Sequence, residues 1–154
     1  MAADFGCGTG GWAIPLAKRL GSGRVYAIDV QEEVLSALKT KVEMEKINNI
    51  KVVKADLEQS LGSSIQNNLL DLILMTNLLF QVKDKKGILG EAKRILRSGG
   101  RLVLVDWKPD SPFGPQDNRL SLSEAKEMAQ ALGLTAEKEL NVGAYHWGLI
   151  LAKN

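Results

Sequence analysis

The sequence has one cysteine, one histidine, no long apolar run and little net charge. The single cysteine, Cys7, rules out an internal disulfide bond, so a secreted disulfide scaffold is not expected. No segment approaches the roughly twenty apolar residues of a membrane-spanning helix. A positively charged stretch followed by an apolar stretch, as in a signal peptide, is not seen either. We therefore expect neither a membrane span nor a signal peptide, and we expect a cytoplasmic location.

The charge and the length limit the class of protein further. The formal net charge is only +2, and the basic residues are scattered along the chain, so nucleic acid is not an expected partner. The 154 residues, 45% of them hydrophobic, are enough for one well-packed core. We therefore expect a single domain over residues 1–154.

A glycine-rich segment, Ala3-Asp4-Phe5-Gly6-Cys7-Gly8-Thr9-Gly10-Gly11, lies between a short apolar run and an amphipathic helical pattern. A strand, a tight loop and a helix in this order form a site for a nucleotide-like ligand, because the N–H groups of the helix N-terminus point at the loop. Gly6, Gly8 and Gly11 fit the dinucleotide fingerprint, which would indicate an oxidoreductase. Asp4 instead favours a cationic ligand, since its carboxylate would repel a bound pyrophosphate.

Periodicity predicts alternating strands and helices. After the loop, a helix is expected from about Gly11 or Trp12 to Leu20. The segment 57–68 is polar and is expected to contain one or two helical turns. Two final strands are separated by only four residues, which is too short for a crossover helix and predicts an antiparallel hairpin. The expected strands are 2–6, 24–29, 50–55, 69–76, 101–106, 134–140 and 145–152. The later helices are expected from Gln31, over 84–97 and after Ser121, which has capping-box spacing to Glu124.

Polar residues follow the predicted strands at their carboxyl ends, where open α/β sheets bind ligands. Asp29 ends the second strand and is suited to accept the two hydroxyls of a ribose. Asp56 follows the third strand and is suited to an adenine amine, with the amide of Leu57 beside it. Val30 would lie against the adenine ring. On its own, either aspartate could equally cap a helix.

The chain resembles class I S-adenosylmethionine-dependent methyltransferases, in particular the ubiquinone and menaquinone branch. The resemblance is carried by the glycine loop, by the strand-end acids Asp29 and Asp56, and by the segment Gly90 to Leu102. The resemblance implies an α/β fold with a doubly wound, mostly parallel seven-stranded sheet and a C-terminal antiparallel hairpin. It implies S-adenosylmethionine as cofactor, a small-molecule methyl acceptor and no metal. The implied cofactor-binding residues are Asp4, Phe5, Gly6, Cys7, Gly8, Thr9, Gly10, Asp29, Val30, Asp56, Leu57, Asn77 and Leu78.

The sequence departs from this family in two places. Relatives usually carry helices before the first strand, and here they are missing, so we expect a truncated chain, an unusually open site or a partner chain such as a second copy. Phe80 stands where many relatives have a histidine, which removes a general base there. His146, at the start of the last strand, is the remaining candidate base, although it could equally be a packed hairpin residue. Arg119 could bind an anionic substrate or only cap its loop.

Two other functions stay open on the sequence alone. One is an NAD(P)-dependent oxidoreductase, which would need a substrate domain. The other is a subunit that binds S-adenosylmethionine but is inactive alone or dependent on a partner.

Overall fold

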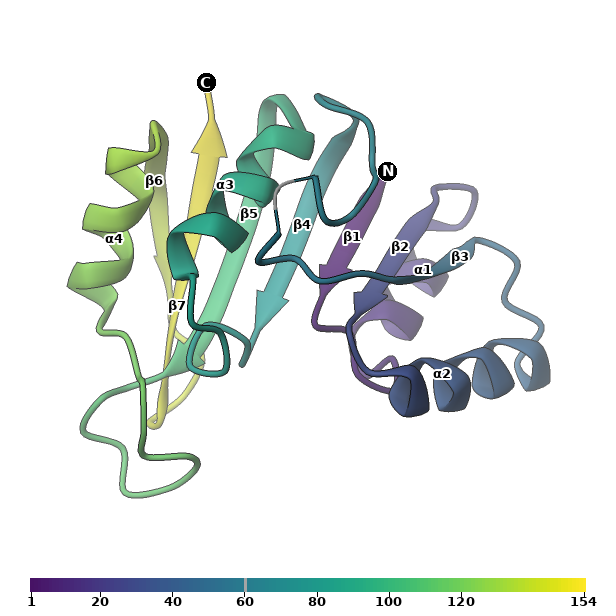
Figure 1. The fold of residues 1–154 in the computed structure, drawn as a ribbon, viewed down its shortest axis with the longest axis horizontal. Helices are drawn as coiled ribbons and strands as arrows, with labels where there is room; N and C mark the ends of the chain where they lie inside the picture. Colours follow the sequence, from purple (N-terminus) through teal and green to yellow (C-terminus); the bar gives the residue numbers. More distant parts are fainter. Residues whose placement is uncertain (60) are drawn as a thin grey trace.

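A computed structural model describes residues 1–59 and 61–154 and shows one mixed β-sheet with helices on both faces (Figure 1). The seven strands lie in the order β3-β2-β1-β4-β5-β7-β6. Among the strands of the described residues, only β7 runs antiparallel to its neighbours, β5 and β6. This confirms the predicted doubly wound sheet with its terminal hairpin. The strands are β1 (Ala2–Phe5), β2 (Val25–Asp29), β3 (Ile50–Lys54), β4 (Leu70–Thr76), β5 (Leu96–Trp107), β6 (Leu134–Leu140) and β7 (His146–Lys153).

The four helices found in the described part of the chain divide between the two faces of the sheet. α1 (Ala13–Leu20) and α2 (Glu32–Met44) pack against β2 and β3. α3 (Lys85–Ile95) packs against β5, and α4 (Leu122–Ala131) packs against β6 and β7. None of the helices in the described part of the chain is long and apolar enough to cross a membrane.

Two apolar clusters form the core, one on each face. The larger cluster joins alternate residues of the strands, such as Phe5 and Met75, to Ile88 and Leu89 of α3. The smaller one lies beneath α1 and α2. Alternation along the strands explains this division, because successive side chains point to opposite faces. On the face away from α3, five apolar side chains remain half-buried: Leu72, Leu74, Val103, Val105 and Ile150.

Local signals in the sequence explain several element ends. Pro15 is the third residue of α1, within the first turn, where its missing N–H costs no helical hydrogen bond. Ser121 and Glu124 form the predicted capping box at α4, with both reciprocal hydrogen bonds present. Asn49 donates from Nδ2 to the carbonyls of Ala17, Gly21 and Gly23 and so fastens the end of α1 to the start of β3.

Two predicted elements are corrected. The expected helical turns over 57–68 include Ser60, which lies outside the described residues, and the described part forms turns instead. Leu61, Ser64 and Asn68 adopt positive φ there, which a right-handed helix does not allow. The helix expected to run to residue 97 ends at Ile95, because the chain then pairs with β4 and bulges before the regular register resumes.

We predict that Gly10→Ala destabilises the fold. Gly10 has φ +90°, and an added Cβ would overlap Leu38 Cδ1 of α2 and lie 3.1 Å from Ile14 Cδ1. Backbone strain and overpacking should together lower the free energy of unfolding by about 2–4 kcal/mol in urea titrations.

Gly143→Ala is the matched control for this prediction. Gly143 has φ +98° but open space around its Cβ position, so only the backbone strain of about 1–2 kcal/mol applies. Equal losses in the two variants would show that contact with Leu38 does not fix the loop.

Candidate functional site

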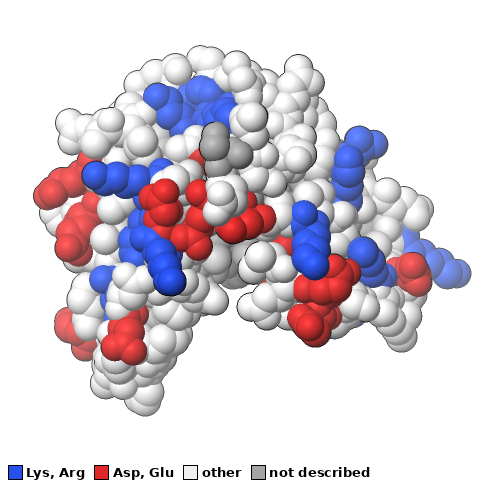
Figure 2. Space-filling model, in the orientation of Figure 1, with Lys and Arg blue, Asp and Glu red and all other residues white. Residues whose placement is uncertain are grey.

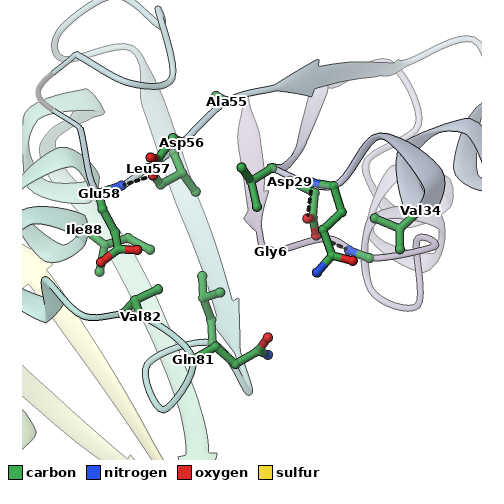
Figure 3. Close-up of a pocket in the computed structure, with 14 residues that line it drawn as sticks. Gly6, Asp29, Val34, Ala55, Asp56, Leu57, Glu58, Gln81, Val82 and Ile88 are labelled. Atoms are coloured by element: carbon green, nitrogen blue, oxygen red, sulfur yellow. Dashed lines mark hydrogen bonds between the residues drawn. The ribbon is translucent and has the colours of Figure 1, made fainter.

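The carboxyl ends of the parallel strands surround a cavity of about 370 Å³. Its walls come from the loop after β1, the ends of β2 and β3, the loop after β4 and the start of α3. Figure 3 shows Asp29 and Val34 on one side of the opening, with Asp56, Leu57, Glu58 and Ile88 across from them. In the space-filling view the surface is notched between the half carrying β1–β3 and the rest (Figure 2). The cavity thus lies at the carboxyl ends of the strands, near the point between β1 and β4 where the strand order reverses.

Asp29 holds the glycine loop in place. Its Oδ2 accepts a hydrogen bond from the Gly8 N–H at 3.0 Å, and its Oδ1 accepts one from the Gln31 N–H at 3.0 Å. Each carboxylate oxygen keeps a further lone pair. Because Asp29 also lines the cavity, it can accept hydrogen bonds from a ligand while it orients the loop.

Gly8 leaves room for a ligand. It has φ +51°, and a Cβ built at this position meets no heavy atom within 4 Å. Since Gly8 lines the cavity, any side chain here would occupy ligand space. Gly6 is different, because its Cβ position lies 2.8 Å from Leu78 Cδ1 of the loop after β4. The two glycines thus serve ligand approach and packing, respectively.

Asp4 is buried directly behind this loop, with an exposed fraction of 1%. Its Oδ2 has no hydrogen-bond partner among the described residues. Burial raises the pKa of Asp4 to about 7; the N–H of Ala13 opposes this shift, and the neighbouring Asp29 adds to it. Burial, with Asp4 and Asp29 nearby, also raises the pKa of the Cys7 thiol, which makes a thiolate nucleophile at neutral pH unfavourable.

The predicted cofactor residues divide into two groups. Seven line the cavity: Gly6, Gly8, Asp29, Val30, Asp56, Leu57 and Leu78. The others lie outside its wall: Asp4, Phe5 and Cys7 are buried, Gly10 packs beneath α2, Thr9 is exposed, and Asn77 is exposed at φ +52°. Direct ligand contact stays a prediction for both groups.

Asp106 was missed by the sequence analysis, although it lies one residue before the end of β5, much as Asp29 ends β2. It is buried, and its Oδ2 accepts a hydrogen bond from Leu79 N–H at 2.8 Å while Oδ1 accepts one from Trp107 N–H at 2.7 Å. Burial raises its pKa, and these amides with that of Phe80 oppose the shift. Asp106 thus fixes the loop after β4, which carries Leu78 into the cavity wall.

Other cavity residues gave no usable signal in the sequence. Glu58 Oε1 accepts hydrogen bonds from the N–H groups of Lys83 and Asp84, at 2.8 and 2.6 Å, and so ties the segment after β3 to the start of α3. The further lining residues are Gln31, Val34, Ala55, Gln81, Val82 and Ile88. Their positions depend on contacts between segments far apart in the chain.

His146 lies at the same edge of the sheet as the carboxyl ends of the parallel strands, because it pairs with Trp107 at the end of β5. Its ring lies 4.0 Å from the Trp107 ring, and its Nε2 is buried without a hydrogen-bond partner in the described part of the chain. It does not line the cavity described above. A role as base stays a prediction.

Arg119 caps its own loop. Its guanidinium donates to the carbonyls of Pro115 at 2.5 Å, Lys108 at 3.0 Å, Ser111 at 2.7 Å and Phe113. These bonds use Nε and both terminal nitrogens, so little donor capacity is left for an anionic substrate.

We predict that Asp4→Asn stabilises the protein increasingly as the pH rises from about 4 to about 7, and fully above that. The folded state holds the Asp4 proton more tightly than the unfolded chain does, so the contribution of Asp4 to stability is present below about pH 4 and is lost as the pH rises to about 7. At pH 8, Asn should raise the free energy of unfolding by about 2–4 kcal/mol, and near pH 4 by almost nothing. Urea titrations of both proteins across this range measure the difference, and a constant difference would contradict the prediction.

Comparisons with known proteins identify the family of this chain. A family model described as a methyltransferase domain matches residues 2–100. A demethylmenaquinone methyltransferase of Geobacillus kaustophilus is 31% identical over 114 residues, which are 73% of this chain and 47% of that protein. The chain therefore spans about half the length of the curated relatives it matches first.

Solved structures share the fold. A SAM dependent methyltransferase from Aquifex aeolicus superposes with a TM-score of 0.88 at 28% identity, covering 97% of this chain and 80% of that one. The cyclase SpnF superposes with a TM-score of 0.87 at 14% identity, covering 99% and 73%, and shows the fold alone. From the family match over residues 2–100, the chain belongs to the methyltransferase domain family, as its glycine loop and strand-end acids predicted.

Proposed function

We propose that this chain binds S-adenosylmethionine in the cavity between the glycine loop and α3 and transfers its methyl group to a small molecule. The observation that carries this proposal is that the Asp29 carboxylate and the open Gly8 backbone face the same cavity. The matching methyltransferase domain model supports it, and so do relatives named as methyltransferases. The fold by itself does not decide the reaction, since a cyclase shares it.

The cavity walls suit the adenosine half of this cofactor. The carboxylate of Asp29 keeps lone pairs for the two ribose hydroxyls. Val30, Leu57 and Ile88 provide apolar surface for a flat base, and Asp56 stands at the edge of that surface. Asp56 Oδ1 already accepts a hydrogen bond from Glu58 N–H at 3.0 Å, which orients its carboxylate.

The acidic surroundings of the loop suit the other half of the cofactor. S-adenosylmethionine carries an ammonium and a sulfonium, and Asp4 and Asp29 flank the loop that would meet them. A nearby cation favours the ionised form of a buried carboxyl. The same two carboxylates would repel the pyrophosphate of a dinucleotide, so the oxidoreductase alternative gains nothing from the structure.

The residues of the chain then have simple tasks. The cofactor, when bound, supplies a methyl group already activated by its positive sulfur. The glycine loop and Asp29 hold the donor, and the segment braced by Asp106 shapes the wall beside it, so that the reaction depends on orientation and exclusion of water. A base is needed only for an acceptor that must lose a proton. His146 is our candidate for that step.

A second candidate function is a cofactor-binding subunit that another polypeptide completes. The five half-buried apolar side chains on the face of β4, β5 and β7 away from α3 favour it, because a mostly parallel sheet normally has both faces covered. Tight cofactor binding without methylation of any tested acceptor would favour this candidate over the first.

We predict that Asp29→Ala weakens binding of S-adenosylmethionine and S-adenosylhomocysteine by about ten-fold or more, because hydrogen bonds to a charged group are lost. Calorimetric titration measures both affinities. Asp29→Asn separates loss of the charge from loss of the hydrogen bond that holds the loop, since its side-chain oxygen can still accept from Gly8 N–H while the charge is gone.

Asp71→Ala is the control for this titration. Asp71 lies at the opposite end of β4, paired with Arg97 and with the terminal amine, and its removal should leave both affinities unchanged. An affinity unchanged in Asp29→Ala would place Asp29 outside the site.

We predict that His146→Ala lowers turnover at least ten-fold while cofactor affinity stays within about two-fold, because a general base commonly contributes a factor of 100 or more. Initial rates at saturating cofactor, followed across pH 6–9, test this together with the titration. Parallel loss of affinity and turnover, or a loss of rate without a change in the pH profile, would assign His146 a packing role.

A further inference from the structure

The wall segment after β4, residues 77–82, is held in place from two sides. Three of its residues line the cavity: Leu78, Gln81 and Val82. From one side, the buried carboxylate of Asp106 accepts hydrogen bonds from its N–H groups. From the other side, the loop after β5 binds its carbonyl groups. A segment fixed through both its donors and its acceptors keeps one position, and the proposed cofactor site depends on that position.

Asn118 makes the second set of bonds. Its Nδ2 donates to the Phe80 carbonyl at 2.8 Å and to the Val82 carbonyl at 3.0 Å. Its Oδ1 accepts a hydrogen bond from Lys85 Nζ at 2.7 Å. The backbone of Asn118 has φ +59°, a left-handed conformation that asparagine adopts more readily than most residues. Asparagine suits this position because one short amide group donates two hydrogen bonds and accepts others.

Lys85 adds a third connection at the start of α3. Its ammonium also donates to the Val82 carbonyl at 3.1 Å. Burial lowers the pKa of Lys85, and the carboxylates of Asp106 and Glu58 oppose this shift. The wall segment, the start of α3 and Asn118 therefore meet around one lysine, close to two of the carboxylates that shape the cavity.

The loop that contains Asn118 is stiff. This loop, residues 108–119, holds three of the four prolines, and we call it the proline loop. The guanidinium of Arg119 donates to carbonyl groups along its length. At Gly114 an added Cβ would lie 2.6 Å from Trp107 Cε2, so the loop backbone lies against the end of β5. Although the structure describes all of residues 108–119, none of them lines the cavity. Any effect of the proline loop on a bound cofactor therefore passes through its bonds to neighbouring segments.

We infer that Asn118 is a positioning residue for the cofactor: it joins the stiff proline loop to the wall segment and so holds Leu78 and Val82 in the position that binds the cofactor. This inference rests on the proposed function, because it concerns the same cavity. By linkage, a cofactor that needs the wall in this position also stabilises the bonds that hold it there. Cofactor binding therefore disfavours opening of a loop that does not line its cavity.

The first test replaces Asn118 and titrates S-adenosylhomocysteine by calorimetry. Asn118→Gly keeps the left-handed backbone and removes all three side-chain bonds. Asn118→Asp keeps an acceptor for Lys85 but places a carboxylate against the two wall carbonyls. Each variant should bind about five-fold or more weakly, because two hydrogen bonds to the wall are lost. Unchanged affinity in both folded variants would overturn the inference.

Asn68 provides a matched control. It has φ +56°, and its Oδ1 accepts a hydrogen bond from Lys153 Nζ at 2.7 Å. It precedes β4, at the end of that strand opposite to the cavity. Asn68→Gly and Asn68→Asp repeat the same chemical changes and should leave the affinity within about two-fold. Urea titrations of all four variants report the loss of stability. If the Asn68 variants lose as much affinity as the Asn118 variants, loss of stability explains the effect and the inference is wrong.

Hydrogen exchange of the wild-type protein tests the linkage without any variant. Saturating S-adenosylhomocysteine should slow exchange in the proline loop by about five-fold, the same factor as the affinity loss, because the coupling is reciprocal. In Asn118→Gly, also at saturation, this protection should disappear, while the glycine loop stays protected. A purely structural role for Asn118 would leave the ligand-dependent protection in place. Exchange in the wild-type proline loop that the ligand does not change would also contradict the inference.

The wild-type titration separates this inference from the proposed function. If the wild type fails to bind S-adenosylhomocysteine, the proposed function fails and this inference fails with it. If the wild type binds and both Asn118 variants bind equally well, only this inference fails.

Discussion

The hydrogen bonds of Asp29 are the interaction on which the rest of the site depends. By accepting from Gly8 N–H and Gln31 N–H, its carboxylate joins the loop after β1 to the end of β2 and to the start of α2. The loop itself contains three glycines at positive φ and has few side chains with which to hold a shape. Its conformation is therefore set from outside, by a residue that also faces the cavity.

Asp106 repeats this arrangement on the other half of the sheet. There a buried carboxylate at the end of β5 holds the N–H groups of the loop after β4. Glu58 does the same between the segment after β3 and the start of α3. Three carboxylates thus position three loops around one cavity, since backbone amides near a site need acceptors and carboxylates are strong ones.

Asp4 has a different relation to stability. Its burial with an unpartnered oxygen is unfavourable for the ionised form in the folded protein. A cationic ligand at the loop would offset that cost, which explains why such a residue would be kept behind it. Stability and ligand binding are then opposed at this one residue, as is common at functional sites.

The sequence by itself determined the alternation of strands and helices, the antiparallel hairpin and the family, because strand periodicity, glycines and short connections act locally. It also placed Asp29, Asp56 and the glycine loop at one edge, since parallel strands bring their carboxyl ends together. The end of α3 and the turns after β3 were not determined locally, because pairing of Leu96 with Leu70 and positive φ at Leu61 overrode helical preference. Only the tertiary structure brought Glu58 to Lys83 and Asp106 to Leu79, because these contacts join segments that no sequence period connects.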